Sequence, residues 1–203
     1  SILTIDETIP ELVQLEITSS NELDAKRSMP GDSITFQVNT NESINAPLFT
    51  INEETYDGAV GLDKSWMLVY PADEADDGII EFEMTYTDLA GNPGVPVTAA
   101  TDGVPIIKDG TTPELDEISL FTSNSYDSSL AIKDDTVFIN FKSSESIRDI
   151  KISLNSNEAI LKNEDSLTFT FYHIFTESDS QGVIPILLDY RDLAGNVGET
   201  IDE

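Results

Sequence analysis

The sequence predicts an all-β protein built from two tandem Greek-key β-sandwiches. Three observations support this fold class: apolar and polar residues alternate over several short segments, clusters of Gly, Pro, Asn and Asp separate those segments, and one long residue pattern occurs twice. Alternation with a period of two is typical of strands that bury one face. About seven such strands in roughly a hundred residues are typical of a sandwich.

The repeated pattern divides the chain into two units. The matching segments, at offsets of 103 to 104, are 6–12 with 109–115, 32–44 with 135–147, and 86–92 with 190–196. Three matches in the same order indicate a duplicated domain. We therefore expect one domain over 1–103 and a second over 104–203. The pattern favours two units of a longer array, with a natural two-domain protein as the alternative.

Strand positions follow from the alternating segments. The expected starts of the first, second and penultimate strands, first unit then second, are Leu12 and Leu115, Ile34 and Val137, and Ile80 and Ile184. The last strand of each unit should follow the Ala-Gly-Asn turn. Pro185 falls inside a penultimate strand, where it cannot donate a ladder hydrogen bond, so we expect a bulge or local unpairing there.

The charge balance restricts the partners of this chain. It has 39 Asp and Glu against 10 Lys and Arg, a formal net charge of -29. We therefore expect no nucleic-acid partner and no membrane contact by this segment. Divalent cations or high external salt would neutralise the charge, and both indicate an environment outside the cytosol. A merely soluble acidic surface is the alternative.

Several kinds of chemistry are excluded or disfavoured. The chain has no Cys and a single His, which excludes disulfides, thiolate metal sites and multi-histidine metal sites. His173 lies in an alternating segment, which predicts that it is a strand residue. Trp66 and Tyr70 share one strand face, which favours core packing over sugar stacking. Acidic residues that recur in both units favour structure over catalysis, and we do not expect an enzyme.

Certain motifs resemble a known family. These are Asp-Leu-Ala-Gly-Asn at 88–92 and 192–196, the Asp-x-Thr-x-Pro openings at Asp6 and Asp109, and the Asn-Glu or Ser-Glu loops. Together they resemble bacterial immunoglobulin-like (Big-type) repeat domains of large calcium-dependent surface adhesins, over nearly the whole chain. The resemblance implies an immunoglobulin-like sandwich, secretion, a place in a stalk, and calcium at domain junctions.

Acidic residues stand at three places in each unit that should meet. In a seven-stranded immunoglobulin-like sandwich the chain entry, the B–C loop and the F–G loop share one pole. Calcium binds about six to eight oxygen atoms in flexible geometry. The candidate calcium ligands are Asp6, Glu42, Asp88 and Asn92 in the first unit, and Asp109, Glu145, Asp192 and Asn196 in the second.

Alternatives to metal binding remain open at these positions. The Asp-Leu-Ala-Gly-Asn segments are also typical of hairpin turns, and Glu42 and Glu145 can be ordinary exposed loop residues. Asp102 is a possible extra ligand. The acidic segment 73–78 resembles an EF-hand loop, but Ala75 and Met84 occupy ligand positions, so we interpret it as a solvated loop.

The leading functional hypothesis is a calcium-binding extender repeat of a secreted cell-surface adhesin, stiffened by metal at domain junctions. We expect an extracellular location, a monomer, contacts with neighbouring repeats of the same chain, and host or surface ligands bound through other domains. The alternative is a surface-lattice (S-layer-like) module or a glycan- or protein-binding β-sandwich.

Overall fold

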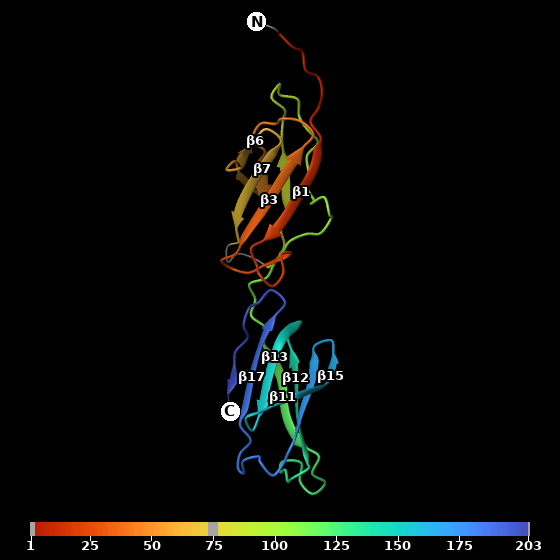
Figure 1. Ribbon diagram of the computed structural model, residues 1–203, viewed down its shortest axis with the longest axis vertical. Helices are drawn as coiled ribbons and strands as arrows, with labels where there is room; N and C mark the ends of the chain where they lie inside the picture. The colour runs from red at the N-terminus through yellow and green to blue at the C-terminus, as the bar shows by residue number, and fades with distance from the viewer. Residues whose placement is uncertain (1–2, 73–76, 203) are drawn as a thin grey trace. The chain divides into compact units, whose positions relative to one another are not determined.

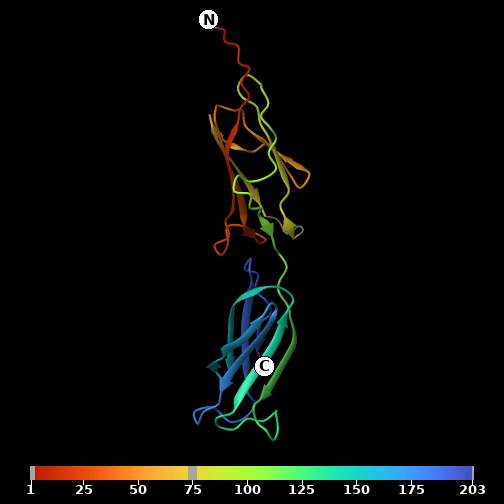
Figure 2. The ribbon, with the colours of Figure 1, turned by 90° about the vertical axis from the view of Figure 1, so that its right-hand side faces the viewer.

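The computed structural model describes residues 3–72 and 77–202, and these residues form strands, turns and loops without a helix. In the same ranges no helix is long and apolar enough to cross a bilayer. The all-β prediction is confirmed. Two compact units, Ser1–Gly110 and Thr111–Glu203, each carry their own sheets (Figures 1 and 2).

The first unit stacks two antiparallel sheets. One has the order β1-β3-β7-β6 and the other the order β5-β4-β9. The first sheet comprises β1 (Leu12–Ser19), β3 (Ser33–Thr40), β7 (Ser65–Pro71) and β6 (Val60–Leu62), and the second comprises β5 (Glu54–Tyr56), β4 (Leu48–Ile51) and β9 (Phe82–Thr85). A small third sheet joins β2 (Arg27–Ser28), β10 (Ile107–Lys108) and β8 (Gly78–Ile79).

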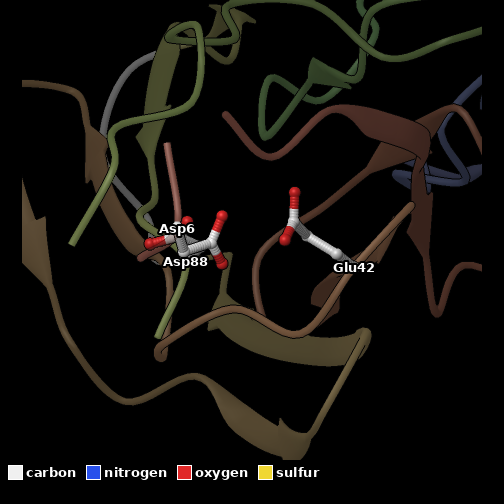
Figure 3. Close-up of side chains that lie close together, drawn as sticks. All are labelled: Asp6, Glu42 and Asp88. Carbon is white, nitrogen blue, oxygen red and sulfur yellow. The ribbon is translucent and has the colours of Figure 1, made fainter. Parts of the chain in front are cut away.

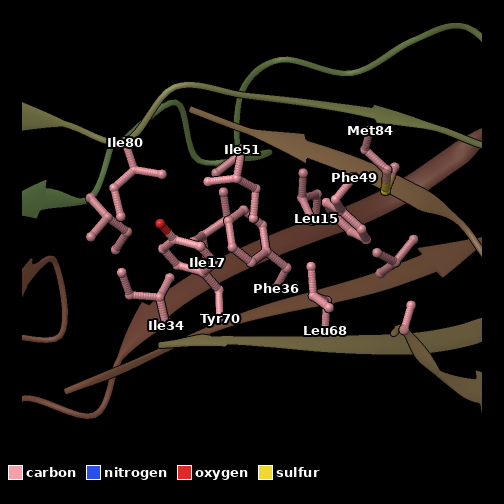
Figure 4. Close-up of a cluster of buried hydrophobic side chains, with 14 of the residues drawn as sticks. Leu15, Ile17, Ile34, Phe36, Phe49, Ile51, Leu68, Tyr70, Ile80 and Met84 are labelled. Atoms are coloured by element: carbon pink, nitrogen blue, oxygen red, sulfur yellow. The ribbon is translucent and has the colours of Figure 1, made fainter. Parts of the chain in front are cut away.

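Alternation along the strands builds one core between the two main sheets (Figure 4). Ile34, Phe36 and Val38 point inward from β3 and are fully buried, while the residues between them face outward. The rings of Phe36 and Phe49 meet across the sheets with centroids 5.2 Å apart. Strand alternation therefore produces a sandwich in which two half-apolar sheets cover each other.

The second unit repeats this arrangement, except that its second sheet has four strands rather than three. Its sheets have the orders β11-β12-β16-β15 and β14-β13-β17-β18. The first comprises β11 (Leu115–Thr122), β12 (Thr136–Ser143), β16 (Thr168–Ile174) and β15 (Ile160–Asp165), and the second comprises β14 (Asn157–Glu158), β13 (Ile147–Leu154), β17 (Ile186–Asp192) and β18 (Ile201–Asp202). Val137, Ile139 and Phe141 of β12 fill the core as their equivalents do in β3.

The strands differ from expectation in two details. The penultimate strands begin two residues later than expected, at Phe82 and Ile186. Pro185 therefore precedes β17, and its carbonyl accepts a hydrogen bond from the Asn155 N–H at 2.9 Å. Of the two expectations for Pro185, local unpairing holds, because Pro185 lies outside the β13–β17 ladder, and a bulge does not. The register shift lies between Arg148 and Lys151 of the partner strand β13, where Asp149 has φ 51°.

The boundary between compact units falls after Gly110, seven residues beyond the boundary suggested by the repeat. The reason is local strand pairing. Ile107 pairs with Arg27 in parallel and with Ile79 in antiparallel orientation, so β10 belongs to the first unit although its sequence matches the opening of the repeat.

Candidate metal centre

The turn between β9 and the last segment of the first unit is organised by Asp88. Its Oδ1 accepts hydrogen bonds from the backbone N–H groups of Ala90, Gly91 and Asn92 at 2.9, 2.7 and 2.7 Å, and its Oδ2 accepts one from Asn92 Nδ2 at 2.7 Å. Gly91 has φ 97°, which an L side chain rarely adopts. The turn interpretation of this motif therefore holds, whatever else Asp88 binds.

These bonds determine the charge state of Asp88. The side chain is 1% exposed. Burial raises the pKa of its carboxyl, but the Asn92 side chain and the backbone N–H groups outweigh that effect and leave the pKa lowered. Because Oδ1 already accepts three bonds, Oδ2 is the atom with a lone pair left for a further partner.

Glu42 reaches the same place from the loop between β3 and β4. The Thr40 hydroxyl donates to the Glu42 carbonyl at 2.6 Å, which shapes this loop. Glu42 Oε1 is buried and has no hydrogen-bond partner among the described residues. A buried carboxylate oxygen without a donor is costly, so this atom calls for a cation or another ligand.

Asp6 belongs to the segment that enters the unit before β1. Its Oδ1 accepts a hydrogen bond from the Thr8 N–H at 3.0 Å, and its backbone carbonyl accepts one from Asn92 Nδ2 at 3.1 Å. Asn92 therefore ties the entering segment to the turn through its side-chain amide nitrogen. Its side-chain oxygen, Oδ1, is the atom that could bind a metal.

Three carboxylates converge in the first unit. One oxygen from each of Asp6, Glu42 and Asp88 lies within 4.8 Å of the others. Figure 3 shows the carboxylate of Glu42 directed toward the other two. Calcium–oxygen distances are about 2.3–2.6 Å, so two oxygens on one ion lie at most about 5 Å apart. The spacing therefore fits a single ion.

No ion pair among the described residues neutralises this group. Across residues 3–72 and 77–202, none of the ion pairs includes Asp6, Glu42 or Asp88. Three anions so close together repel one another unless a cation neutralises them. A set made only of hard oxygen ligands suits calcium better than zinc or copper.

The second unit has the same local turn. Asp192 is fully buried, and its Oδ1 accepts bonds from the Gly195 and Asn196 N–H groups at 2.6 and 2.8 Å. Its Oδ2 accepts one from Asn196 Nδ2 at 2.7 Å. The hydroxyl of Ser143 donates to the carbonyl of Glu145 at 2.5 Å, as Thr40 does for Glu42. Both loops are thus built alike.

Asp109 and Asp102 lie in the first unit and contact basic residues there. Asp109 Oδ2 is 3.8 Å from Arg27 Nη1. Asp102 Oδ2 is 2.8 Å from Lys26 Nζ, and its other oxygen accepts a bond from the Val104 N–H. The hydrogen bond from Lys26 lowers the pKa of Asp102. Asp102 is therefore engaged with lysine rather than available as an extra ligand.

Other residues singled out from the sequence have structural positions. Trp66 is half-buried in β7 against the core, and Leu68 and Tyr70 of the same face are buried. His173 lies in β16, and its Nε2 is 3.1 Å from Asp179 Oδ1. Residues 73–76 of the acidic loop lie outside the described residues.

Sequence reasoning missed the residues that hold the loops in place. Asn45 Nδ2 donates to the Asp88 carbonyl at 2.6 Å, and Asn41 Oδ1 accepts from the Glu11 N–H at 2.9 Å. The Asn41 contact has an equivalent in the second unit, where Ser144 Oγ accepts a hydrogen bond from the Glu114 N–H. The signal was present, since positions 40 and 41 and positions 143 and 144 are polar in both repeats.

No protein-family model matches the chain, and a search of curated proteins finds no match.

Proposed function

We propose that this chain is a calcium-binding extender segment of a secreted cell-surface adhesin, formed by two immunoglobulin-like sandwiches and without catalytic activity. The strand orders support the fold: an immunoglobulin-like sandwich places strands A, B, E and D in one sheet and C, F and G in the other. The orders β11-β12-β16-β15 and β13-β17-β18 agree with that rule.

The observation that carries calcium binding is the orphaned Glu42 Oε1 beside the carboxylates of Asp6 and Asp88. Calcium would be held by Glu42, by Asp88 through Oδ2 and by Asp6, with backbone carbonyls and water completing the shell. Bound calcium would tie the entering segment to two loops of the unit. Its role in the proposal is mechanical, because it would restrain the entering segment relative to these loops.

For the second unit we propose the equivalent set of Asp109, Glu145, Asp192 and Asn196. This part of the proposal rests on the repeat and on the matching loops of Glu145 and Asp192. Because Asp109 lies two residues before the start of the second unit, calcium bound there would restrain the junction. A calcium-loaded array would then be stiffer than a calcium-free one, as an extender requires.

The decisive experiment is calorimetric titration of the chain with calcium, together with Glu42→Gln and Glu145→Gln variants. Each variant keeps the side-chain shape and removes one charge, so each should lose one binding site. Glu22→Gln, at an exposed position of the first unit, is the matched control. An isotherm without calcium binding, or one unchanged by Glu42→Gln, would overturn the proposal.

Thermal unfolding gives a second readout. Calcium at about a hundred times its Kd should stabilise the folded state by about 2.7 kcal/mol relative to a chelator. Trp66, the only tryptophan, reports on the first unit. If concentrated sodium chloride stabilises the chain equally well without calcium, the surface-lattice alternative is favoured instead.

A further inference from the structure

The second unit carries an open groove where β11 ends and β12 begins. Its volume is about 1190 Å³, and its lining includes Leu120–Thr122, Ser128–Lys133 and Gly182–Ile184. Several apolar side chains in this lining are exposed to water. They are Leu120 at 38%, Leu130 at 60%, Ile132 at 67% and Val183 at 91%. A concave surface of this size with several exposed apolar side chains is typical of a binding site.

The corresponding place in the first unit is filled by the chain itself. There β10 lies between β2 and β8 as the middle strand of three. The Ile107 N–H donates to the Lys26 carbonyl at 3.0 Å, and the Ile80 N–H donates to the Ile106 carbonyl at 3.0 Å. Just before β10, Thr101 exchanges two hydrogen bonds with the backbone of Leu15.

The repeat offsets place the groove of the second unit at the position, or slot, that β10 occupies in the first unit. At the repeat offsets, β2 corresponds to Leu130–Ala131 and β8 to Gly182–Val183, and both segments line the groove. Leu120 corresponds to Ile17 and pairs with Ile139 as Ile17 pairs with Phe36. Yet Ile17 is 3% exposed and Leu120 is 38% exposed.

The strand that fills the first slot has a definite chemistry. Ile106 is 2% exposed and belongs to the core cluster, and Lys108 is 7% exposed. Pro105 keeps the approach extended before the two adjacent isoleucines. An occupant of the second slot therefore needs a short polar approach, a proline and two adjacent aliphatic residues.

We infer that the groove of the second unit is a docking site for a peptide strand with the chemistry of Thr101–Lys108, joined to the unit after its last strand. It would add to Leu130–Ala131 and Gly182–Val183 as β10 adds to β2 and β8. Main-chain hydrogen bonds supply affinity in this mode of recognition, and side-chain pockets supply specificity. The inference does not depend on calcium.

The test appends a copy of Ala100–Asp109 after Glu203, which aligns with Ala99 at the repeat offset of 104. The control chain carries the same ten residues in scrambled order. All measurements are made with a chelator present. We expect the true copy, and not the scrambled one, to raise the Tm of the second unit by at least about 5 °C. Hydrogen exchange of the Ile184 amide should slow, because it would gain the bond that Ile80 makes.

Two results would overturn the inference. In the first, the true and scrambled extensions give the same Tm and the same Ile184 exchange. In the second, the unextended chain dimerises with rising concentration and Leu120→Asp abolishes the dimer, which would make a second copy of the chain the occupant. A free peptide of residues 100–109 that protects Ile184 in the unextended chain, in a manner lost with Leu120→Asp, would support the docking site.

Discussion

The two units share turn chemistry, loop capping and the strand order of their first sheet, and they differ at the end where the first strand finishes. In the first unit, Ile106 closes the core and Ile17 is buried beneath the chain. In the second, Leu120 occupies the register position of Ile17 and stays exposed. A residue pattern can thus repeat faithfully while its burial does not, because burial depends on which segments cover it.

The comparison also separates local from non-local effects. The Asp88 and Asp192 turns have equivalent hydrogen bonds, because each turn is made by five consecutive residues. The slot beside β2 depends instead on a segment some eighty residues farther along the chain. Local chemistry is carried by the motif itself, whereas closure of the core requires a distant strand.

Truncating the two equivalent core positions should give the largest difference. Ile17→Ala should cost the first unit about 2–4 kcal/mol, because it leaves a cavity in a closed core. Leu120→Ala should cost the second unit about 1 kcal/mol, since part of that side chain already contacts water. Trp66 fluorescence follows the first unit, and hydrogen exchange at Ile139 follows the second. Equal losses would mean that Leu120 is packed as tightly as Ile17.

Asp179 should make the second unit sensitive to acid. The Thr176 N–H donates to it at 2.7 Å, and bonds from the Thr176 hydroxyl, His173 and Asn155 add to that effect. Although burial opposes them, they hold the pKa of Asp179 at about 2, below its usual 3.8. Because the folded value is the lower one, its contribution is complete above about pH 4 and is lost as the pH falls through about 2.

Asp179→Asn tests that dependence. The variant should lose about 2 kcal/mol at neutral pH, because donors that faced a carboxylate lose an acceptor. Its stability should then change less than that of the parent chain between about pH 4 and pH 2. Urea unfolding at several pH values, followed by exchange at Ile139, provides the measurement. Parallel curves for variant and parent would contradict the assignment.

Gly94 and Gly198 occupy equivalent positions in the two units, and their substitution by alanine should destabilise the two units equally. A Cβ at Gly94 would lie 2.3 Å from the Tyr86 ring, and one at Gly198 would lie 2.1 Å from the Tyr190 ring. Both rings are buried, so Gly94→Ala and Gly198→Ala should each cost about 1–2 kcal/mol. Gly58→Ala, with open space around its Cβ, is the control for thermal unfolding. A loss in one unit only would break the equivalence.

The sequence predicted most of what depends on neighbouring residues. Alternation placed β3 and β12 correctly, and the repeated turns located Asp88 and Asp192 where their carboxylates cap the backbone. Topology reasoning anticipated that Asp6, Glu42 and Asp88 would converge. Calcium at that place stays a prediction.

What the sequence did not predict depends on long-range pairing. Residues 104–109 match the opening of the repeat, and this match suggested that they belong to the second unit. In the structure Ile107 and Lys108 pair instead with β2 and β8, two earlier strands of the first unit. Asp102 looked like a loop carboxylate, yet folding brings Lys26 to it from a segment far away in the chain. Periodicity carries no information about such partners, because many exposed lysines and aspartates look alike in one sequence.

The smallest expected effect concerns that ion pair, which joins the closing segment to the first unit. Lys26 Nζ lies 2.8 Å from Asp102 and also donates to the Ile17 carbonyl at 2.9 Å. The second unit has Ser129 at the equivalent position. Lys26→Ser should therefore cost about 0.5–1 kcal/mol, because part of the pair is exposed to solvent.

Two further measurements test the Lys26 prediction: its dependence on ionic strength, and the reverse substitution Ser129→Lys in the second unit. The loss caused by Lys26→Ser, measured through Trp66 in urea, should shrink at high ionic strength, since salt screens the Lys26–Asp102 attraction in the parent chain. Ser129→Lys should stabilise the second unit less than Lys26 stabilises the first, because it also removes the hydrogen bond from the Ser129 hydroxyl to Asp127 Oδ1. If Ser129→Lys stabilised the second unit as much as Lys26 stabilises the first, Glu177 or Asp179 of the groove lining would be the partner of the new lysine, and the difference between the two ends would be smaller than the exposure of Leu120 implies.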